Sequence, residues 1–196
     1  MRYIRWLLVF VSILVIRGPL DAAQEETVET KVKTMLLDPT TNAPVIVLET
    51  VADKKLVPIW IDIPEARAIA LELQHVPTPR PLTHDLIRNI LQSLGATLQR
   101  VTITDIRDNT YFAVLHLRVK GEELQIDSRP SDAIAVALRM NAPIFTAVQV
   151  LAKSKPAPAP GAPAEQLRHK LGVQSQSLTG PLPTLIDVQL LNAVRR

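Results

Sequence analysis

One stretch decides the fold, because an alternating segment turns there into an alanine-rich one: Ile126-Asp127-Ser128-Arg129-Pro130-Ser131-Asp132-Ala133-Ile134-Ala135. Its first residues end a short β-strand. The run from Pro130 to Met140 predicts a helix, since proline suits the first helical turn and alanine is the best helix former. Such a junction points backbone N–H groups and the positive end of the helix dipole toward a ligand. The stretch therefore predicts a strand followed by a helix, with an anion-binding position at their junction.

The same pattern occurs 65 residues earlier, where six positions match at a constant offset. Ile61-Asp62, Ala68-Ile69-Ala70 and Leu73 correspond to Ile126-Asp127, Ala133-Ile134-Ala135 and Leu138. In both copies a β-hairpin leads through a proline into an Ala-Ile-Ala helix. We therefore expect two similar β-hairpin–helix units, packed about a pseudo-twofold axis with their small alanine faces close to a sheet.

Alternating and β-rich segments predict strands over residues 28–37, 44–50, 56–61, 97–106, 111–119, 124–127 and 143–151. Three helices are expected to begin near Pro64, Thr83 and Pro130. For the middle helix we expect Thr83 as the N-cap and Gly95 as the terminator. Its apolar residues recur at helical spacing and predict a buried stripe made of Leu86, Ile87, Ile90, Leu91 and Leu94.

Composition divides the 196 residues into four segments. Residues 1–23 contain a basic start and an apolar run too short to span a bilayer, which predicts a signal peptide, with an uncleaved anchor as the alternative. Residues 24–151 form the α+β domain, 152–163 a Pro/Ala-rich linker, and 164–196 a basic tail with short helices. The expected location is periplasmic or extracellular. We expect no stable transmembrane span in the mature chain.

Charge and cysteine content limit the chemistry. The chain has no cysteine, which excludes a disulfide framework, a cysteine-ligated zinc site and a thiol nucleophile. The whole chain carries +3, whereas residues 24–151 hold 13 Lys/Arg and 16 Asp/Glu and carry −3. Because general nucleic-acid binders usually show a basic footprint, the domain would need a local basic patch to bind RNA or DNA.

The junction at residues 126–135 carries the first candidate site. Arg129 is suited to bind a phosphate with two hydrogen bonds. Asp127 and Asp132 are five residues apart, so they are candidates to share a divalent metal such as Mg²⁺ or to position a water. The structural alternative is that Ser131 or Asp132 only caps the helix, and that Asp127 and Arg129 only form an ion pair.

A second candidate site lies at Arg80-Pro81-Leu82-Thr83-His84-Asp85-Leu86. His84 is able to act as an acid, a base or a metal ligand near neutral pH. Asp85 is favourable in the first helical turn whatever its function, so helix capping is the alternative for this pair.

Taken together, these motifs resemble the bifunctional nuclease (BFN) domain family over about residues 30–152. The resemblance is carried by Leu56-Val57-Pro58-Ile59-Trp60-Ile61, Glu65-Ala66-Arg67-Ala68-Ile69-Ala70, Arg80–Leu86 and Asp127–Ala135. It implies an α+β fold with a mixed, partly barrel-like sheet, and nuclease activity on RNA and DNA. The motif residues carried over as candidates are His84, Asp85, Asp127 and Asp132 for catalysis, and Arg129 and Ser131 for substrate binding. Asp62 stands where the family usually has glycine.

Three functions follow from these observations. The first is a nuclease that hydrolyses phosphodiester bonds of RNA or DNA. The second is a non-catalytic binding or assembly module, exported to the cell envelope and able to form a homo-oligomer. The third, which rests on charge alone, is an envelope protein that binds anionic surfaces through residues 152–196. Convergence of the acidic, histidine and arginine candidates in one open pocket would favour the nuclease.

Overall fold

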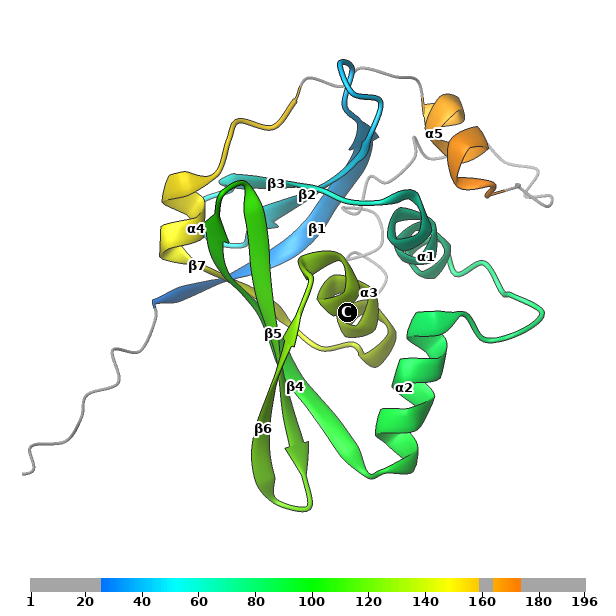
Figure 1. Ribbon diagram of the computed structural model, residues 1–196, viewed down its shortest axis with the longest axis vertical. Helices are drawn as coiled ribbons and strands as arrows, with labels where there is room; N and C mark the ends of the chain where they lie inside the picture. Colours follow the sequence, from blue (N-terminus) through cyan, green and yellow to red (C-terminus); the bar gives the residue numbers. More distant parts are fainter. Residues whose placement is uncertain (1–25, 159–163, 174–196) are drawn as a thin grey trace, which may run out of the picture.

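The computed structural model describes residues 26–158 and 164–173, which form a seven-stranded mixed sheet and five helices (Figure 1). The strands are β1 Thr27–Leu37, β2 Pro44–Thr50, β3 Leu56–Trp60, β4 Ala96–Arg107, β5 Thr110–Val119, β6 Glu122–Ser128 and β7 Ile144–Ala147. The helices are α1 Ile63–Leu73, α2 Thr83–Ser93, α3 Pro130–Met140, α4 Val148–Lys153 and α5 Ala164–Leu171. The predicted α+β class is confirmed.

The sheet has the order β3-β2-β1-β7-β4-β5-β6. Two antiparallel meanders, β1-β2-β3 and β4-β5-β6, are joined by β7, which pairs antiparallel with β1 and parallel with β4. The sheet is mixed, as expected, and it is not closed into a barrel. The meanders are linked instead by the Tyr111 hydroxyl of β5, which donates to the Pro58 carbonyl of β3 at 2.7 Å, and by α4, which contacts both β3 and β4.

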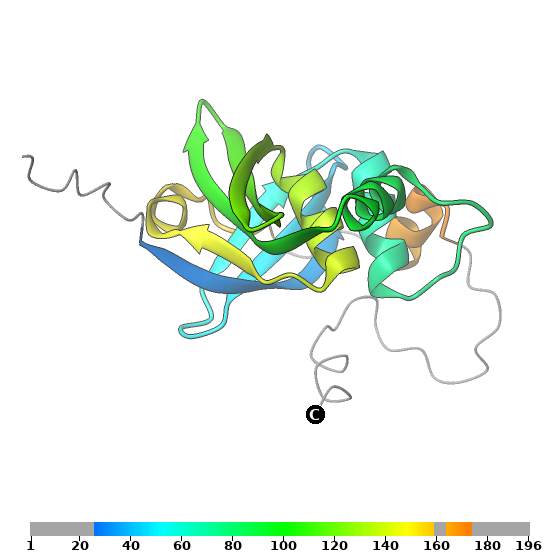
Figure 2. The ribbon, with the colours of Figure 1, turned by 90° about the horizontal axis from the view of Figure 1, so that it is seen from below.

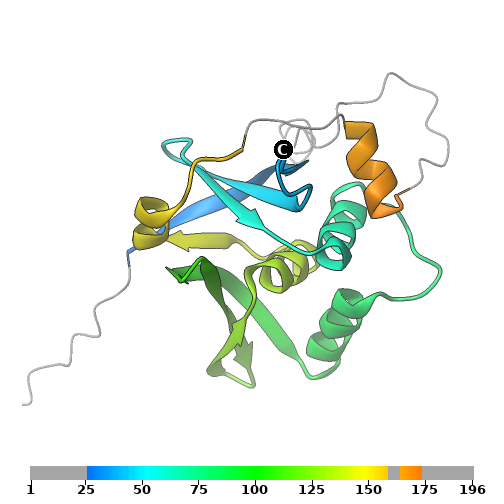
Figure 3. The same cartoon turned by 45° about the horizontal axis from the view of Figure 1, so that its top comes forward.

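Helix α3 lies at the centre of the helical layer, between α1 and α2 (Figures 1 and 3). It also contacts β4 and β5, and its alanine-rich sequence lets these elements approach closely. Residues Ala133 to Ala137 are at most 1% exposed. Helix α4 lies at the opposite end of the sheet from α2 and α5 (Figure 2). The core is therefore built around α3, the helix predicted from Pro130 to Met140.

Both predicted hairpin–helix successions are present in chain order. The β2-β3 hairpin leads into α1, the β5-β6 hairpin leads into α3, and the two helices contact each other. The equivalence of these units about a twofold axis stays a prediction.

Helix α2 differs from its expected form at two points. Its N-cap is Leu82 rather than Thr83, and Gly95 follows its end with a positive φ of 67°, as expected for a terminator. Of the predicted buried stripe, Ile87 and Leu91 contact the core, but Leu86, Ile90 and Leu94 are exposed by 54%, 49% and 63%. The reason is that α2 packs mainly on α3, at the margin of the domain, so only one side of its apolar face is covered.

The segment after α3 also differs from its predicted form. A single strand was expected over residues 143–151, whereas β7 ends at Ala147 and α4 begins at Val148. Helix α5 contacts α1 and β1, and its residues Leu167 and Leu171 are buried. The leader, part of the linker and the tail after residue 173 lie outside the described residues, so the expectation of a further short helix in the tail is not tested there.

Candidate functional site

A histidine and an aspartate from two helix starts form the centre of the site. His84 lies in the first turn of α2, and Asp132 lies in the first turn of α3. His84 Nε2 lies 2.9 Å from Asp132 Oδ1, and His84 is only 5% exposed. Because an ionised carboxylate can only accept a hydrogen bond, Nε2 carries the proton. A neutral His84 therefore has its basic lone pair at Nδ1.

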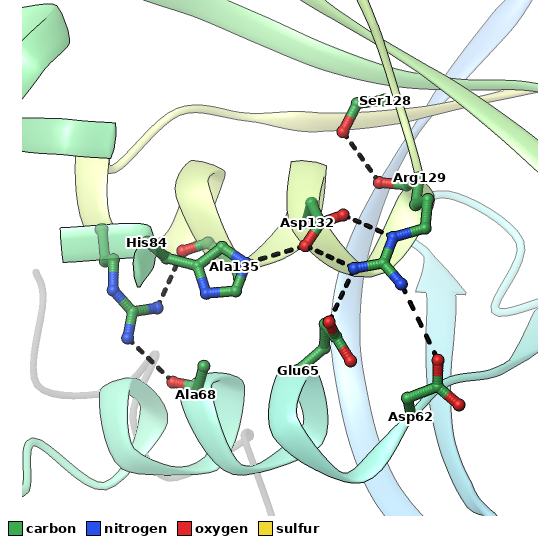
Figure 4. Close-up of polar contacts among 9 residues, drawn as sticks. Asp62, Glu65, Ala68, His84, Ser128, Arg129, Asp132 and Ala135 are labelled. Atoms are coloured by element: carbon green, nitrogen blue, oxygen red, sulfur yellow. Dashed lines mark hydrogen bonds and ion pairs between the residues drawn. The ribbon is translucent and has the colours of Figure 1, made fainter. Parts of the chain in front are cut away.

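Arg129 connects this pair to α1 (Figure 4). Its Nε donates to Asp132 Oδ2 at 2.7 Å, and its Nη2 donates to Glu65 Oε1 at 2.6 Å. The Asp62 carboxylate lies 3.7 Å from Nη1. The guanidinium thus binds three carboxylates, two of them from the start of α1. This arrangement fixes the distance between the starts of α1 and α3.

The charges of the site are set by these contacts. Burial raises the pKa of Asp132, but hydrogen bonds from Arg129 and then from His84 outweigh it, so the net pKa lies below 3.8. Asp132 is therefore ionised at neutral pH. The hydrogen bonds to Asp132 and to Glu65 raise the pKa of Arg129 above its usual value. The hydrogen bonds from Arg129 thus hold the Asp132 carboxylate in place, and this carboxylate orients His84.

The cluster opens into a pocket of about 270 Å³. Its walls come from the starts of the three helices: Pro64, Glu65, Arg67, Ala68, Leu82, Thr83, His84, Arg129 and Asp132. Arg67 is exposed and forms no ion pair with any described residue, and its Nε lies near Gly172 after the end of α5. Glu65 Oε2 is buried and has no hydrogen-bond partner among the described residues. A lone buried carboxylate oxygen is costly, so this atom marks a place for a bound water or donor group.

The sequence reasoning did not single out Glu65 or Arg67 as site residues. Both belong to the stretch Glu65–Ala70, which carries part of the family resemblance, so a signal was present. The spatial relation could not be seen in the sequence, since Glu65 and Arg129 are 64 residues apart.

Asp85, the other candidate of this helix start, takes part in a different contact. Its Oδ2 accepts the backbone N–H of Leu82 at 2.8 Å, and its Oδ1 accepts Arg139 Nε at 2.7 Å. Arg139 is buried and also donates to the carbonyls of Ala68 and Ala135, each at 3.0 Å. The capping alternative is confirmed for Asp85, which accepts the N-cap N–H at the start of α2. It also joins α2 to α1 and α3.

The remaining candidates lie apart from the cluster. Asp127 is exposed on β6 and pairs with Val114 on the sheet face opposite the helices. Ser131 is buried in the first turn of α3, whose N-cap residue is Arg129, so helix capping by Ser131 or Asp132 is wrong. Within the described residues, no group of three or more His, Asp or Glu is arranged to hold a metal ion. Asp127 and Asp132 lie on opposite sides of the sheet, so their positions do not support a shared metal site.

The sequence model of the bifunctional nuclease domain matches residues 46–158, more than half of the chain and every residue of the pocket. The chain belongs to the bifunctional nuclease domain family. An uncharacterized protein of Mycobacterium tuberculosis is 43% identical over 113 residues, which cover 58% of this chain and 67% of that protein.

Plant members of the bifunctional nuclease domain family are more distant. Bifunctional nuclease 1 of Oryza sativa subsp. japonica is 29% identical over 106 residues, 53% of this chain and 32% of the rice protein. Bifunctional nuclease 2 of Arabidopsis thaliana is 29% identical over 89 residues, 44% of this chain and 27% of that protein. The match thus covers about a third of each plant protein or less.

Proposed function

We propose that the chain is a nuclease that hydrolyses phosphodiester bonds of RNA or DNA in the pocket at the starts of α1, α2 and α3. The observation that supports it best is the contact of His84 with Asp132 in a pocket that also presents an arginine. Family membership and the names of the plant relatives support the same class of reaction.

The roles follow from the contacts. His84 Nδ1 accepts a proton from a water, and the water oxygen attacks phosphorus as the bond to the leaving oxygen breaks. The leaving oxygen takes up a proton from solvent, and the protonated imidazole returns its proton to solvent. Arg67 binds the non-bridging phosphate oxygens and stabilises their developing charge. Asp132 is a positioning residue that fixes the tautomer and orientation of His84. Arg129 is a positioning residue for Asp132 and Glu65, because its donors are already occupied by carboxylates.

The test is cleavage of labelled single- and double-stranded RNA and DNA by the full chain, with and without Mg²⁺ and EDTA. We expect His84→Gln to lower kcat by about 10²–10⁴-fold, the usual contribution of an acid–base residue. His75→Asn is the matched control, since His75 is exposed and its positive φ of 52° suits asparagine. Absence of cleavage by the wild-type chain, or equal cleavage by His84→Gln, would overturn the proposal.

The binding or assembly module is the second candidate, and the Arg129 contacts favour it. An arginine held by three carboxylates at the junction of α1 and α3 is also what a purely structural clamp requires. In that case Arg129→Met lowers stability and Asp132→Asn has no effect beyond stability. The nuclease predicts in addition that folded Asp132→Asn protein loses kcat.

Export and self-association are part of the proposal. The leader at residues 1–23 supports secretion, and we expect the exported chain to begin near Gln24, which N-terminal sequencing of secreted protein would check. Across residues 26–158 and 164–173, no helix has the length and apolar character needed to cross a bilayer. Formation of a homo-oligomer stays a prediction.

A further inference from the structure

The sheet has a second face, turned away from α3, that the proposed nuclease site does not use. On β5, Leu115 and Leu117 are buried in the core, so the alternating residues Phe112, His116 and Arg118 lie on the opposite, outer face. Arg100 pairs with His116, and Phe145 pairs with Thr102, which places both on the same outer face. The outer face of β7, β4, β5 and β6 therefore carries aromatic and basic side chains.

Both phenylalanines of the described residues are on this face. The chain has only three, and the third, Phe10, is in the leader. Phe112 and Phe145 remain partly exposed, and each lies under an arginine: Arg107 is 4.9 Å from the Phe112 ring and Arg100 is 5.9 Å from the Phe145 ring. Burial of these rings in the core would contribute more hydrophobic stabilisation than their position on the sheet surface. Placing them beside arginines on a sheet surface instead favours stacking with a ligand.

A pocket of about 240 Å³ lies at the Phe145 end of this face. Arg100, His116, Phe145, Gln99 and Gln125 contribute to its walls. Arg100 forms no ion pair with a described carboxylate, whereas Glu123, the acidic residue of the pocket, lies 3.2 Å from Arg118. The remaining polar groups are two amides and an imidazole. The pocket thus combines one available cation, an aromatic ring and neutral hydrogen-bonding groups.

The imidazole of His116 is neutral at neutral pH. Burial lowers its pKa, and the nearby Arg100 lowers it further, while Glu123 opposes these effects. Its Nε2 lies 3.1 Å from the Thr102 hydroxyl. The pocket therefore presents uncharged donors and acceptors, of the kind that recognise the edge of a base, next to one guanidinium.

We propose that this outer-face pocket binds an unpaired base of single-stranded nucleic acid, which stacks on Arg100 and Phe145; the inference rests on the proposed nuclease function. Arginine planes and aromatic rings are the usual stacking partners of unpaired bases, and bases within a duplex are not available to them. Gln125 binds the base edge, together with the amide N–H groups of Gln99, whose side-chain oxygen accepts from Arg118. The charge of Arg100 favours the adjoining phosphate.

Strand β6 connects the two sites. Gln125 lines the outer-face pocket and Arg129 lines the nuclease pocket, four residues further along. At about 3.3 Å per strand residue, the backbones of Gln125 and Arg129 are roughly 13 Å apart along the chain. Beyond β6 the sheet has no further strand among the described residues, so one nucleic-acid strand passing over this edge would reach both pockets. The outer-face pocket would then hold substrate beside the site of cleavage.

The test measures binding of a fluorescent single-stranded oligonucleotide to the full chain by anisotropy, in a His84→Gln background that prevents cleavage. Phe145→Leu keeps apolar volume but removes the ring, and is expected to weaken binding roughly tenfold. Arg100→Lys keeps the charge but removes the planar guanidinium, so comparison with Arg100→Ala separates stacking from charge. Gln125→Ala, at an exposed position, adds a variant whose folding is not at risk.

We expect Phe145→Leu and Arg100→Lys to bind the single-stranded oligonucleotide more weakly. Their affinities for an abasic oligonucleotide and for a duplex should not change. The same two substitutions made in a chain that keeps His84 should leave cleavage of a dinucleotide unchanged. Equal affinities in all variants would overturn the proposal, and so would a loss seen only with Arg100→Ala, because that result indicates charge alone. If no substrate is cleaved but the binding pattern holds, the nuclease proposal fails and the outer-face pocket stands.

Discussion

Replacement of Asp85 by alanine tests whether this aspartate is catalytic or structural. In the structure its carboxylate bridges the backbone N–H of Leu82 and the guanidinium of Arg139. The Arg139 side chain is 2% exposed, and it also donates hydrogen bonds to the carbonyls of Ala68 and Ala135. Asp85→Ala would therefore leave a buried positive charge without its principal carboxylate. We expect the loss to appear in stability and not in the chemical step.

The size of the loss follows from burial. Removing one partner of a buried ion pair costs about 3–5 kcal/mol. The lower end applies here, because Glu72 Oε2 lies 4.0 Å from Arg139 Nε and remains as a weak partner. Loss of the bond to the N-cap N–H adds about 1 kcal/mol. We expect Asp85→Ala to lower the free energy of unfolding by roughly 4 kcal/mol, a large part of a small domain's stability.

Urea denaturation followed by circular dichroism at neutral pH would measure this difference, with the exposed Asp127→Ala as the matched control. The double variant Asp85→Leu, Arg139→Met should recover most of the loss, since it removes both charges together. A fully stable Asp85→Ala protein that has lost nuclease activity would refute the structural role. Loss of stability without recovery in the double variant would refute the buried-charge explanation.

Four further outcomes are expected. Burial raises the pKa of Asp85 but its hydrogen bonds lower it more, so the pKa of Asp85 in the folded state is depressed. The contribution of Asp85 to the free energy of unfolding is therefore present above about pH 4 and lost as pH falls. The stability difference between wild type and Asp85→Ala should shrink accordingly when denaturant titrations are made at acid pH. Leu94→Ala should change the unfolding free energy by less than about 0.5 kcal/mol, whereas Ile134→Ala should cost about 2–5 kcal/mol in the same assay. Tyr111→Phe should cost about 1 kcal/mol, through the lost bond to the Pro58 carbonyl, and equal melting temperatures would contradict it. Asp127→Asn should leave cleavage rates unchanged, and a large fall in kcat would return Asp127 to the catalytic group.

Local patterns predicted most elements because each depends on neighbours in the chain. The strand from Pro44 to Thr50 and the helix from Pro130 to Met140 have their predicted bounds. The exposed stripe of α2 was missed because helical periodicity shows which residues share a face and not how much of that face a neighbour covers. The last strand was predicted too long, since Val148–Lys153 is apolar enough to suit either a strand or a buried helix.

The candidate site was predicted less completely, because its contacts join distant parts of the chain. His84 and Asp132 were both named from local motifs, but their contact spans 48 residues and no local pattern predicts it. The same motifs named Asp127, which the strand period turns to the other face of the sheet. Arg139 was not singled out, although a charged residue inside an alanine-rich helix is a signal in itself, since a buried arginine requires partners.

The junction of β6 and α3 separates two surfaces within a few residues. Alternation along β6 directs Gln125 and Asp127 to the outer face, while the turn into α3 directs Arg129 and Asp132 into the nuclease pocket. A shift of one residue in the register of β6 would exchange its two faces, and would bring Ile126 to the outer face. The bond between Arg129 and Glu65 opposes such a shift, because it fixes the end of β6 to α1. Arg129, which the sequence suggests as a phosphate ligand, is thus better explained as the residue that holds β6 in its register and so keeps the two surfaces apart.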